Sequence, residues 1–335
     1  MLGGRLDKGP LPEAAGRISL IVKPEVLLVR AIYAPTIAEL ELEFTVHKLW
    51  MVAEPDAYIR QKCANVRAAV TTPPAGFSRR DFEALPKLEI LACFGPHCEL
   101  IDRAAAKEHG VAMIYTPDST AEPVADLAMA MLISVMRRLC EADRFVRAGK
   151  WPGGVFASGR EVHGKTCGIV GFGRIGREIA KRATAFDMSV CYFGPRRKEN
   201  VAYPYFDDLE AMARESDCLI VTCPATPQTR NLIDARILNA LGADGFLVNV
   251  ARGSIVDEPA LIAALAGKRI AGAALDVFQD EPRVPAALLQ MDNVVLAPHI
   301  GTSTRENREE RSRKFLTDLR AHFAGKPLLH LITSQ

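Results

Sequence analysis

Short apolar runs alternate with amphipathic segments along most of the chain. In the first third, runs rich in β-branched and aromatic residues are separated by segments with helical spacing, such as 54–64 and 103–110. Strands that alternate with helices predict βαβ units and a parallel sheet. The five strands expected here are residues 26–31, 44–50, 68–72, 88–94 and 111–116.

A long apolar helix is expected next, over residues 121–148. Glu122 and Pro123 are typical of a first helical turn, and Gly149 is typical of the position that follows a helix. A second alternation of strands and helices begins at Lys165, so the chain is predicted to form two doubly wound α/β domains. The strands expected in this part are 166–170, 189–193, 218–223, 245–250, 270–277 and 293–298, followed by a helix to about residue 324.

Composition narrows the class of protein. The 335 residues suit two globular domains, with 49% apolar and 24% charged residues. The 42 basic and 40 acidic residues leave a formal charge of +2, which gives no support for nucleic-acid or membrane-surface binding. No apolar run of about 18 residues is present, so no membrane span is expected. The segment 1–23 is expected to be a loose extension.

The eight cysteines are scattered, and none forms a CxxC pair. Several lie in apolar runs that are typical of a core. Buried, reduced thiols are therefore favoured over a disulfide framework or a metal site, and the expected location is cytoplasmic.

A glycine motif is the sharpest local signal. Gly171, Gly173 and Gly176 form G-x-G-x-x-G directly after the strand expected at 166–170, at the start of a helix that leads to the strand at 189–193. Such glycines permit a tight turn and close approach of a pyrophosphate to the helix N-terminus. The motif predicts a dinucleotide site; an ordinary tight βα turn is the alternative.

The end of the next strand bears on the choice of cofactor. An NAD site normally carries an acidic residue about 20 residues beyond the glycines. Here Arg196, Arg197 and Lys198 occupy that place, and the first carboxylate is Glu199. Because guanidinium groups suit a 2′-phosphate, NADPH is predicted to be preferred, with NADH possible. The alternative is that these charges belong to a solvated loop.

Four further residues follow apolar strands of the same domain: Arg252, Asp276, Glu281 and His299. In open α/β sheets, ligands bind outside the carboxyl ends of the strands. Hydride transfer to a 2-keto acid needs a proton donor, for which histidine is suited, and a partner carboxylate stabilises the imidazolium. Arg252 could hold a substrate carboxylate. For a histidine alone, a structural role would be the alternative.

Taken together, these motifs resemble the D-isomer-specific 2-hydroxyacid dehydrogenase family over residues 25–330. Within it, the chain is most similar to the NADPH-linked hydroxypyruvate/glyoxylate reductase branch, on the basis of Arg196 and Arg197. The motifs that carry the resemblance are GIVGFGRIG, CPATPQTRNLI, LVNVARGSIVDEPAL, GAALDVFQDEP and LAPHIGTST.

The resemblance implies roles for individual residues. Arg252 would bind the substrate carboxylate and polarise the keto group, His299 would donate the proton, and Glu281 would pair with the histidine. Asp276 would contact the nicotinamide amide. The cofactor-binding set implied in this way is Gly171, Gly173, Arg174, Ile175, Gly176, Arg196, Arg197, Cys223, Pro224, Thr229, Val250, Ala251, Asp276 and Gly301.

The resemblance also implies a domain plan. A Rossmann cofactor domain (119–299) would be inserted into a flavodoxin-like substrate domain (24–118 and 300–335). Closure of the two domains would exclude water from the reacting groups. The long helix and the loop 149–158 would form a dimerisation arm, so a homodimer is expected.

The substrate loop departs from the family pattern. Pro96 and His97 occupy places where the family usually has Val-Gly, and Phe94 and Gly95 could take over the ligand contact. Trp50, at the end of the second expected strand, could wall off the pocket, although core packing is the alternative. These five residues are the candidates for substrate contact.

The predicted activity is therefore NADPH-dependent reduction of small 2-keto acids to D-2-hydroxy acids. Glyoxylate and hydroxypyruvate are the first candidate substrates, and 2-ketogluconate is the next. One alternative keeps the fold but changes the substrate to a phosphoglycerate or aryl-lactate type. Another is a dinucleotide-sensing binding protein without turnover.

Overall fold

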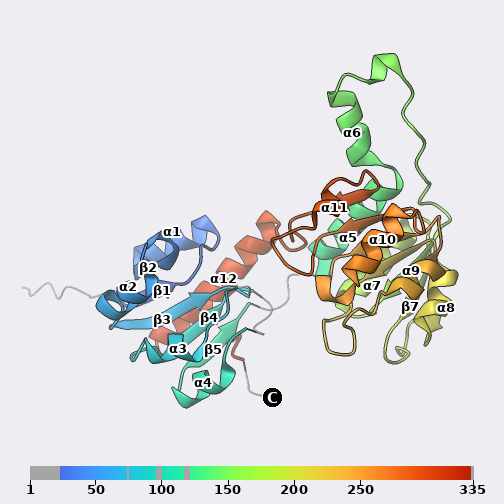
Figure 1. The fold of residues 1–335 in the computed structure, drawn as a ribbon. Coiled ribbons are helices and arrows are strands. Elements are labelled where there is room, and N and C mark those ends of the chain that lie inside the picture. The colour runs from blue at the N-terminus through green and yellow to red at the C-terminus, as the bar shows by residue number, and fades with distance from the viewer. Residues whose placement is uncertain (1–22, 74, 96–99, 117–120, 333–335) are drawn as a thin grey trace, which may run out of the picture. The chain divides into compact units, whose positions relative to one another are not determined.

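The computed structural model describes residues 23–73, 75–95, 100–116 and 121–332. The chain divides into two compact units (Figure 1). Unit 1 comprises Met1–Tyr115 and Phe315–Gln335, and unit 2 is the continuous stretch Thr116–Lys314. The second boundary therefore falls inside the last helix, α12 (Arg305–Phe323).

Unit 1 is built on a five-stranded parallel sheet with the strand order β2-β1-β3-β4-β5. This is the flavodoxin-like order. The strands are β1 (Glu25–Leu28), β2 (Thr45–Lys48), β3 (Val66–Thr71), β4 (Ile90–Cys93) and β5 (Ala112–Tyr115). The helices are α1 (Ala34–Glu43), η1 (Leu49–Met51), α2 (Pro55–Lys62), α3 (Arg79–Glu83) and α4 (Arg103–Glu108).

Both faces of this sheet are covered, which explains why most residues of its inner strands are apolar. On β1, Val26 and Leu28 pack on one face with Leu40 of α1 and Phe315 of α12. Leu27 points to the opposite face, where helices α2, α3 and α4 contribute core side chains. Alternation along a strand thus feeds two separate cores.

Unit 2 holds a seven-stranded sheet in the order β12-β11-β10-β9-β6-β7-β8. All of its pairs are parallel, and the order reverses between β6 and β9, as in the Rossmann fold. The strands are β6 (Thr166–Val170), β7 (Ser189–Phe193), β8 (Tyr205–Phe206), β9 (Cys218–Val221), β10 (Phe246–Asn249), β11 (Gly272–Leu275) and β12 (Val294–Leu296).

Helices cover both faces of this sheet as well (Figure 1). One face is packed by α5 (Ala121–Met136) and α7 (Arg174–Ala185). The other is packed by α8 (Leu209–Arg214), α9 (Ala235–Leu241), α10 (Glu258–Ala266) and α11 (Ala286–Leu289). The two-domain α/β fold class expected from the sequence is confirmed.

The single helix expected over 121–148 is wrong. The chain forms α5 and then a separate helix, α6 (Leu139–Arg147), with Arg138 in the left-handed region at φ 54°. The guanidinium of Arg138 binds both carboxylate oxygens of Glu141 at 2.9 and 2.6 Å, which fixes the turn. Because α6 buries no residue, it is not tied to the face that α5 covers, and it projects from unit 2 (Figure 1).

The cysteines behave as free thiols in the described residues. Cys63, Cys93, Cys167, Cys191 and Cys218 are buried, whereas Cys140 is exposed and Cys223 is half-buried. Throughout the described ranges, no helix is both long enough and apolar enough to cross a membrane.

Candidate functional site

The turn between β6 and α7 is shaped by its glycines. Gly171 has φ +98°, and a Cβ there would lie 2.5 Å from the main-chain nitrogen of Cys223. A Cβ on Gly176 would lie 2.4 Å from the carbonyl oxygen of Gly171. By contrast, a Cβ on Gly173 would meet nothing within 4 Å. Two glycines are therefore required by packing, and the third leaves open space.

That open space lies at the N-terminus of α7. Gly173 is the residue before the helix, and no side chain caps the helix there. The N–H groups of a first helical turn and the helix dipole favour an anion at this point. The turn therefore fits the pyrophosphate of a dinucleotide. Arg174 and Ile175, both predicted to contact the cofactor, form the first turn of the helix.

Basic side chains follow β7, the strand next to β6. Arg196 and Arg197 are exposed, and no residue in the described part of the chain pairs with either guanidinium. The main-chain N–H of Lys198 donates to the hydroxyl of Tyr192 at 2.8 Å, which pins the loop to the strand. Two free cations are thus presented where the second strand of the Rossmann unit ends.

The segment after β9 faces the glycine turn across the reversal of strand order. Cys223 lies against Gly171, as the close Cβ approach shows. Further along, Thr229 donates its hydroxyl to the carbonyl of Pro224 at 2.7 Å. The hydroxyl of Thr229 therefore stabilises this loop, and any contact of Thr229 with a cofactor would be additional to that hydrogen bond.

Arg252 follows β10, and two buried residues, Val250 and Ala251, precede it. Its guanidinium donates to the carbonyl of Ala251 at 2.7 Å. The next residue, Gly253, packs tightly on a neighbouring loop, because a Cβ there would lie 1.9 Å from the carbonyl carbon of Phe278. This contact joins the Arg252 turn to the loop that carries Glu281.

Glu281 and His299 form a direct pair. Nδ1 of His299 lies 2.7 Å from a carboxylate oxygen of Glu281, and the other oxygen accepts the N–H of Phe278 at 3.2 Å. Burial raises the pKa of Glu281, but its hydrogen bond to His299 and the nearby charges of His299 and Arg252 outweigh this and hold the pKa below its usual value. Glu281 is therefore ionised at neutral pH.

Asp276, directly after β11, is only 1% exposed. Its two carboxylate oxygens accept the N–H groups of Ile300 and Gly301 at 2.7 and 2.8 Å, and its carbonyl accepts the N–H of His299 at 2.9 Å. His299 itself is in the left-handed region, at φ 55°. Burial raises the pKa of Asp276 despite these hydrogen bonds. Asp276 thus holds the His299 loop.

The structure therefore gathers Arg252, Glu281 and His299 at one edge of unit 2, after the neighbouring strands β10, β11 and β12. The glycine turn lies after β6 of the same sheet. A carboxylate–imidazole pair beside a guanidinium can bind an anionic substrate and move a proton.

The candidates for substrate contact belong to unit 1. Pro96 and His97 lie outside the described residues. Phe94 is buried against Phe315, with ring centroids 5.8 Å apart, so only its main chain is free to meet a ligand. Gly95 lies against Pro73, and Trp50 in η1 is 36% exposed. Their contact with substrate stays a prediction.

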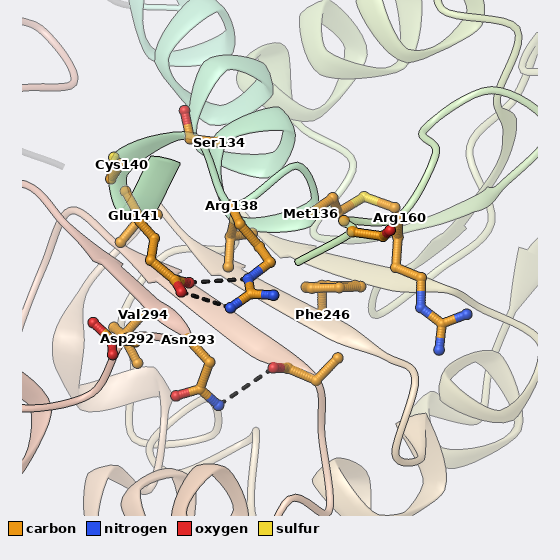
Figure 2. A pocket seen from close by; sticks show the side chains of 15 residues that line it. Ser134, Met136, Arg138, Cys140, Glu141, Arg160, Phe246, Asp292, Asn293 and Val294 are labelled. Carbon is orange, nitrogen blue, oxygen red and sulfur yellow. Dashed lines mark hydrogen bonds and ion pairs between the residues drawn. The ribbon is translucent and has the colours of Figure 1, made fainter. Parts of the chain in front are cut away.

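A cavity of about 290 Å³ lies elsewhere in unit 2, at the base of α6 (Figure 2). Its wall includes Met136, Phe246 and Asn293 together with the paired side chains of Arg138 and Glu141. None of the three residues of the carboxylate–imidazole–guanidinium set lines it. The sequence carried no signal for this cavity, because the break at Arg138 that shapes it was not predicted.

Asn249 and Gly253 were not predicted from the sequence. Both flank Arg252 in the run NVARG, and the polar residue that ends an otherwise apolar strand was the available signal.

Comparisons with known proteins agree on one family. The model of the D-isomer specific 2-hydroxyacid dehydrogenase, NAD binding domain, matches residues 129–301. Glyoxylate/hydroxypyruvate reductase A of Arabidopsis thaliana is 43% identical over 291 residues, which are 87% of this chain and 93% of that protein. Hydroxyphenylpyruvate reductase of Plectranthus scutellarioides is 41% identical over the same shares of the two chains.

A solved structure of similar fold is the NADPH-dependent glyoxylate/hydroxypyruvate reductase of Sinorhizobium meliloti in complex with NADP and malonate. It is 35% identical, with a TM-score of 0.82 over 93% of this chain and 97% of that one. The chain therefore belongs to the D-isomer specific 2-hydroxyacid dehydrogenase family, and it is an oxidoreductase that uses a nicotinamide dinucleotide.

Proposed function

We propose that the protein reduces small 2-keto acids to D-2-hydroxy acids, with glyoxylate and hydroxypyruvate as first substrates and NADPH as the preferred reductant. The observation that carries the proposal is the 2.7 Å contact between His299 and Glu281, next to Arg252 at the strand ends of the dinucleotide domain. The names of the relatives in Arabidopsis and Sinorhizobium support the substrates.

When bound, the nicotinamide supplies the hydride to the keto carbon. Arg252 binds the substrate carboxylate and polarises the keto group. Because Nδ1 of His299 is held by Glu281, Nε2 is the atom left to donate a proton. As the C=O π electrons move to oxygen, that oxygen takes the proton from Nε2, and the ionised Glu281 stabilises the imidazolium before transfer.

His299→Ala tests the assignment of the proton donor. Turnover of glyoxylate, followed by the absorbance of the reduced nicotinamide, should fall about 10²- to 10⁴-fold because general acid catalysis is lost. The dissociation constant of NADPH should stay within about twofold, since the glycine turn is untouched. His163→Ala, on an exposed histidine of the same unit, is the control. Undiminished turnover in His299→Ala would remove His299 from the mechanism.

The preference for NADPH rests on Arg196 and Arg197. Both guanidinium groups are exposed and free of partners in the described residues, so they are available for a 2′-phosphate. The double variant Arg196→Ala/Arg197→Ala should weaken NADPH by about 10-fold or more and leave NADH nearly unchanged, since each charge-assisted hydrogen bond contributes about 1.5–3 kcal/mol. Equal losses for both dinucleotides would contradict the preference.

Bulkier 2-keto acids are the second candidate substrates. The Plectranthus relative, named hydroxyphenylpyruvate reductase, favours an aryl-pyruvate type. A panel of glyoxylate, hydroxypyruvate, 2-ketogluconate and hydroxyphenylpyruvate separates the candidates by kcat/KM. Clear dinucleotide binding without turnover of any acid would instead indicate a dinucleotide-sensing protein.

The remaining proposals concern the whole chain. The domain formed by residues 24–118 and 300–335 is proposed to bind substrate, and residues 119–299 are proposed to form the cofactor domain. The arm, defined as residues 139–158, is proposed to dock a second copy, since it exposes several large apolar side chains. The exposed side chains of the arm are Leu139, Val146, Trp151 and Val155.

A cytoplasmic location is part of the proposal because the described cysteines are free.

A further inference from the structure

Asn249 is the polar residue that ends β10, and it is 1% exposed. Its side chain makes two hydrogen bonds to the turn that follows. The Oδ1 atom accepts the N–H of Ala251 at 3.1 Å, and the Nδ2 group donates to the carbonyl of Arg252 at 3.1 Å. The amide therefore closes the turn from which the guanidinium of Arg252 emerges.

The other side of Asn249 is fixed to the sheet. Its main-chain carbonyl accepts the N–H of Asp276 at 3.0 Å. Asp276 in turn holds the His299 loop through its carbonyl and its carboxylate. Asn249 thus ties the Arg252 turn both to β10 and to the segment that positions the imidazole.

Water has little access to this site, so it cannot replace the hydrogen bonds that the amide of Asn249 makes. Ala251 is 9% exposed and Asn249 is nearly inaccessible, so a shorter side chain would leave a buried N–H without its acceptor. The Arg252 turn cannot compensate by shifting toward Phe278, because Gly253 is already in close contact with that residue. Loss of the amide should therefore turn Arg252 rather than collapse the site.

We infer that Asn249 is a positioning residue for Arg252: its buried amide sets the direction of the guanidinium that binds the substrate carboxylate. This inference rests on the proposed function of Arg252. Asn249 touches neither the reacting atoms nor the glycine turn, so its effect on substrate binding should exceed its effect on dinucleotide binding.

The test uses Asn249→Ala and Asn249→Asp in the full-length protein. With NADPH bound, the dissociation constant of oxamate, an unreactive 2-keto acid analogue, and the KM for glyoxylate should both rise about 10- to 100-fold, the scale expected when a binding group is misplaced by about 1 Å. Asn249→Asp keeps the shape of the side chain but sets a carboxylate oxygen against the carbonyl of Arg252, so it should be no better than alanine. The dissociation constant of NADPH should change far less than that of oxamate, and the pH profile of kcat should not change.

A double-mutant cycle with Arg252→Ala separates positioning from general destabilisation. Once the guanidinium is absent, Asn249→Ala should reduce kcat/KM by less than about twofold further. Asn293→Ala is the matched control, because its amide donates to the carbonyl of Ala271 at 3.3 Å before the start of β12. That variant should retain normal kcat/KM.

Two outcomes would overturn the inference. In the first, Asn249→Ala lowers kcat/KM by the same factor whether or not the Arg252 guanidinium is present. In the second, Asn249→Ala raises the dissociation constant of NADPH by the same factor as that of oxamate. If Asn249→Ala does not fold, the isosteric Asn249→Asp supplies the same comparison. Failure of the proposed function is recognised separately, because the wild-type protein would then turn over no 2-keto acid, or Arg252→Ala would leave glyoxylate turnover intact.

Discussion

At the scale of single residues, the carboxylate–imidazole pair is defined by one contact and one conformation. Glu281 holds Nδ1 of His299, and the left-handed main chain at His299 is kept in place by Asp276. A non-glycine residue with positive φ persists where the surrounding structure determines it, and such positions cluster at functional sites. The fold therefore sets the orientation of the imidazole ring and the hydrogen-bond partner of its Nδ1 atom.

Glu281→Gln should move the pH range of the reaction. The neutral amide no longer favours the protonated imidazole, so kcat/KM for glyoxylate reduction should begin to fall at lower pH than in the wild type. Glu258→Gln is the control, because Glu258 accepts the N–H of Gln279 on the same loop at 3.2 Å without touching His299. Superimposable pH profiles for Glu281→Gln and the wild type would contradict the role of Glu281.

The same substitution has a consequence for stability. The pKa of Glu281 is lowered in the folded state, so its ionised form stabilises the fold at pH values above its ordinary value. That contribution disappears as pH falls through the lowered folded value. The free energy of unfolding of Glu281→Gln, measured with urea at several pH values, should therefore vary less with pH on the acid side than that of the wild type. An equal slope would show that the pair contributes nothing to stability.

At the scale of elements, two glycines of the β6–α7 turn have different roles: Gly171 is required by the fold, whereas Gly173 leaves open space. Gly171→Ala should destabilise the protein by about 1–3 kcal/mol, since it forces an L-residue into a strained conformation against Cys223. Gly173→Ala should leave the melting temperature nearly unchanged, because open space surrounds its Cβ position. It should nevertheless weaken NADPH binding, since a methyl group would occupy the place proposed for the pyrophosphate. Normal NADPH affinity in Gly173→Ala would refute that placement.

Elements were predictable where local pattern and tertiary packing agree. The strands β6 and β7 have the predicted bounds, because each is an apolar run closed by clear turn residues. The two-residue strand β8 was not predicted, since Tyr205 and Phe206 form no run of their own. The break between α5 and α6 was also missed, because Arg138 is neither glycine nor proline. In the structure its left-handed conformation occurs together with an ion pair to Glu141.

The site divides along the same line. Arg252, Glu281 and His299 stood out in the sequence because each follows an apolar strand and has an evident chemistry. Asn249 did not, because its importance lies in two hydrogen bonds to the main chain, which only coordinates reveal. The substrate loop around Pro96 and His97 lies outside the described residues, so its role stays a prediction.

At the scale of the whole molecule, association is the property to test. Val155→Glu places a charge at an arm position whose side chain is 97% exposed, so it should convert a dimer to a monomer in sedimentation velocity without lowering the melting temperature of the monomer. Leu42→Glu is the control, because Leu42 is 74% exposed in unit 1, away from the arm in sequence. A chain that sediments as a monomer before substitution would contradict the proposed dimer.

Helices α5 and α6, on either side of the break at Arg138, should differ in local stability. Helix α5 buries nine side chains, whereas the nine residues of α6 bury none. A short helix without tertiary packing is marginal in water, so its hydrogen bonds open with a small free energy. In an isolated chain the amide protons of α6 should therefore exchange with deuterium orders of magnitude faster than those of α5. Slow exchange in α6 would be a direct sign that another surface covers it.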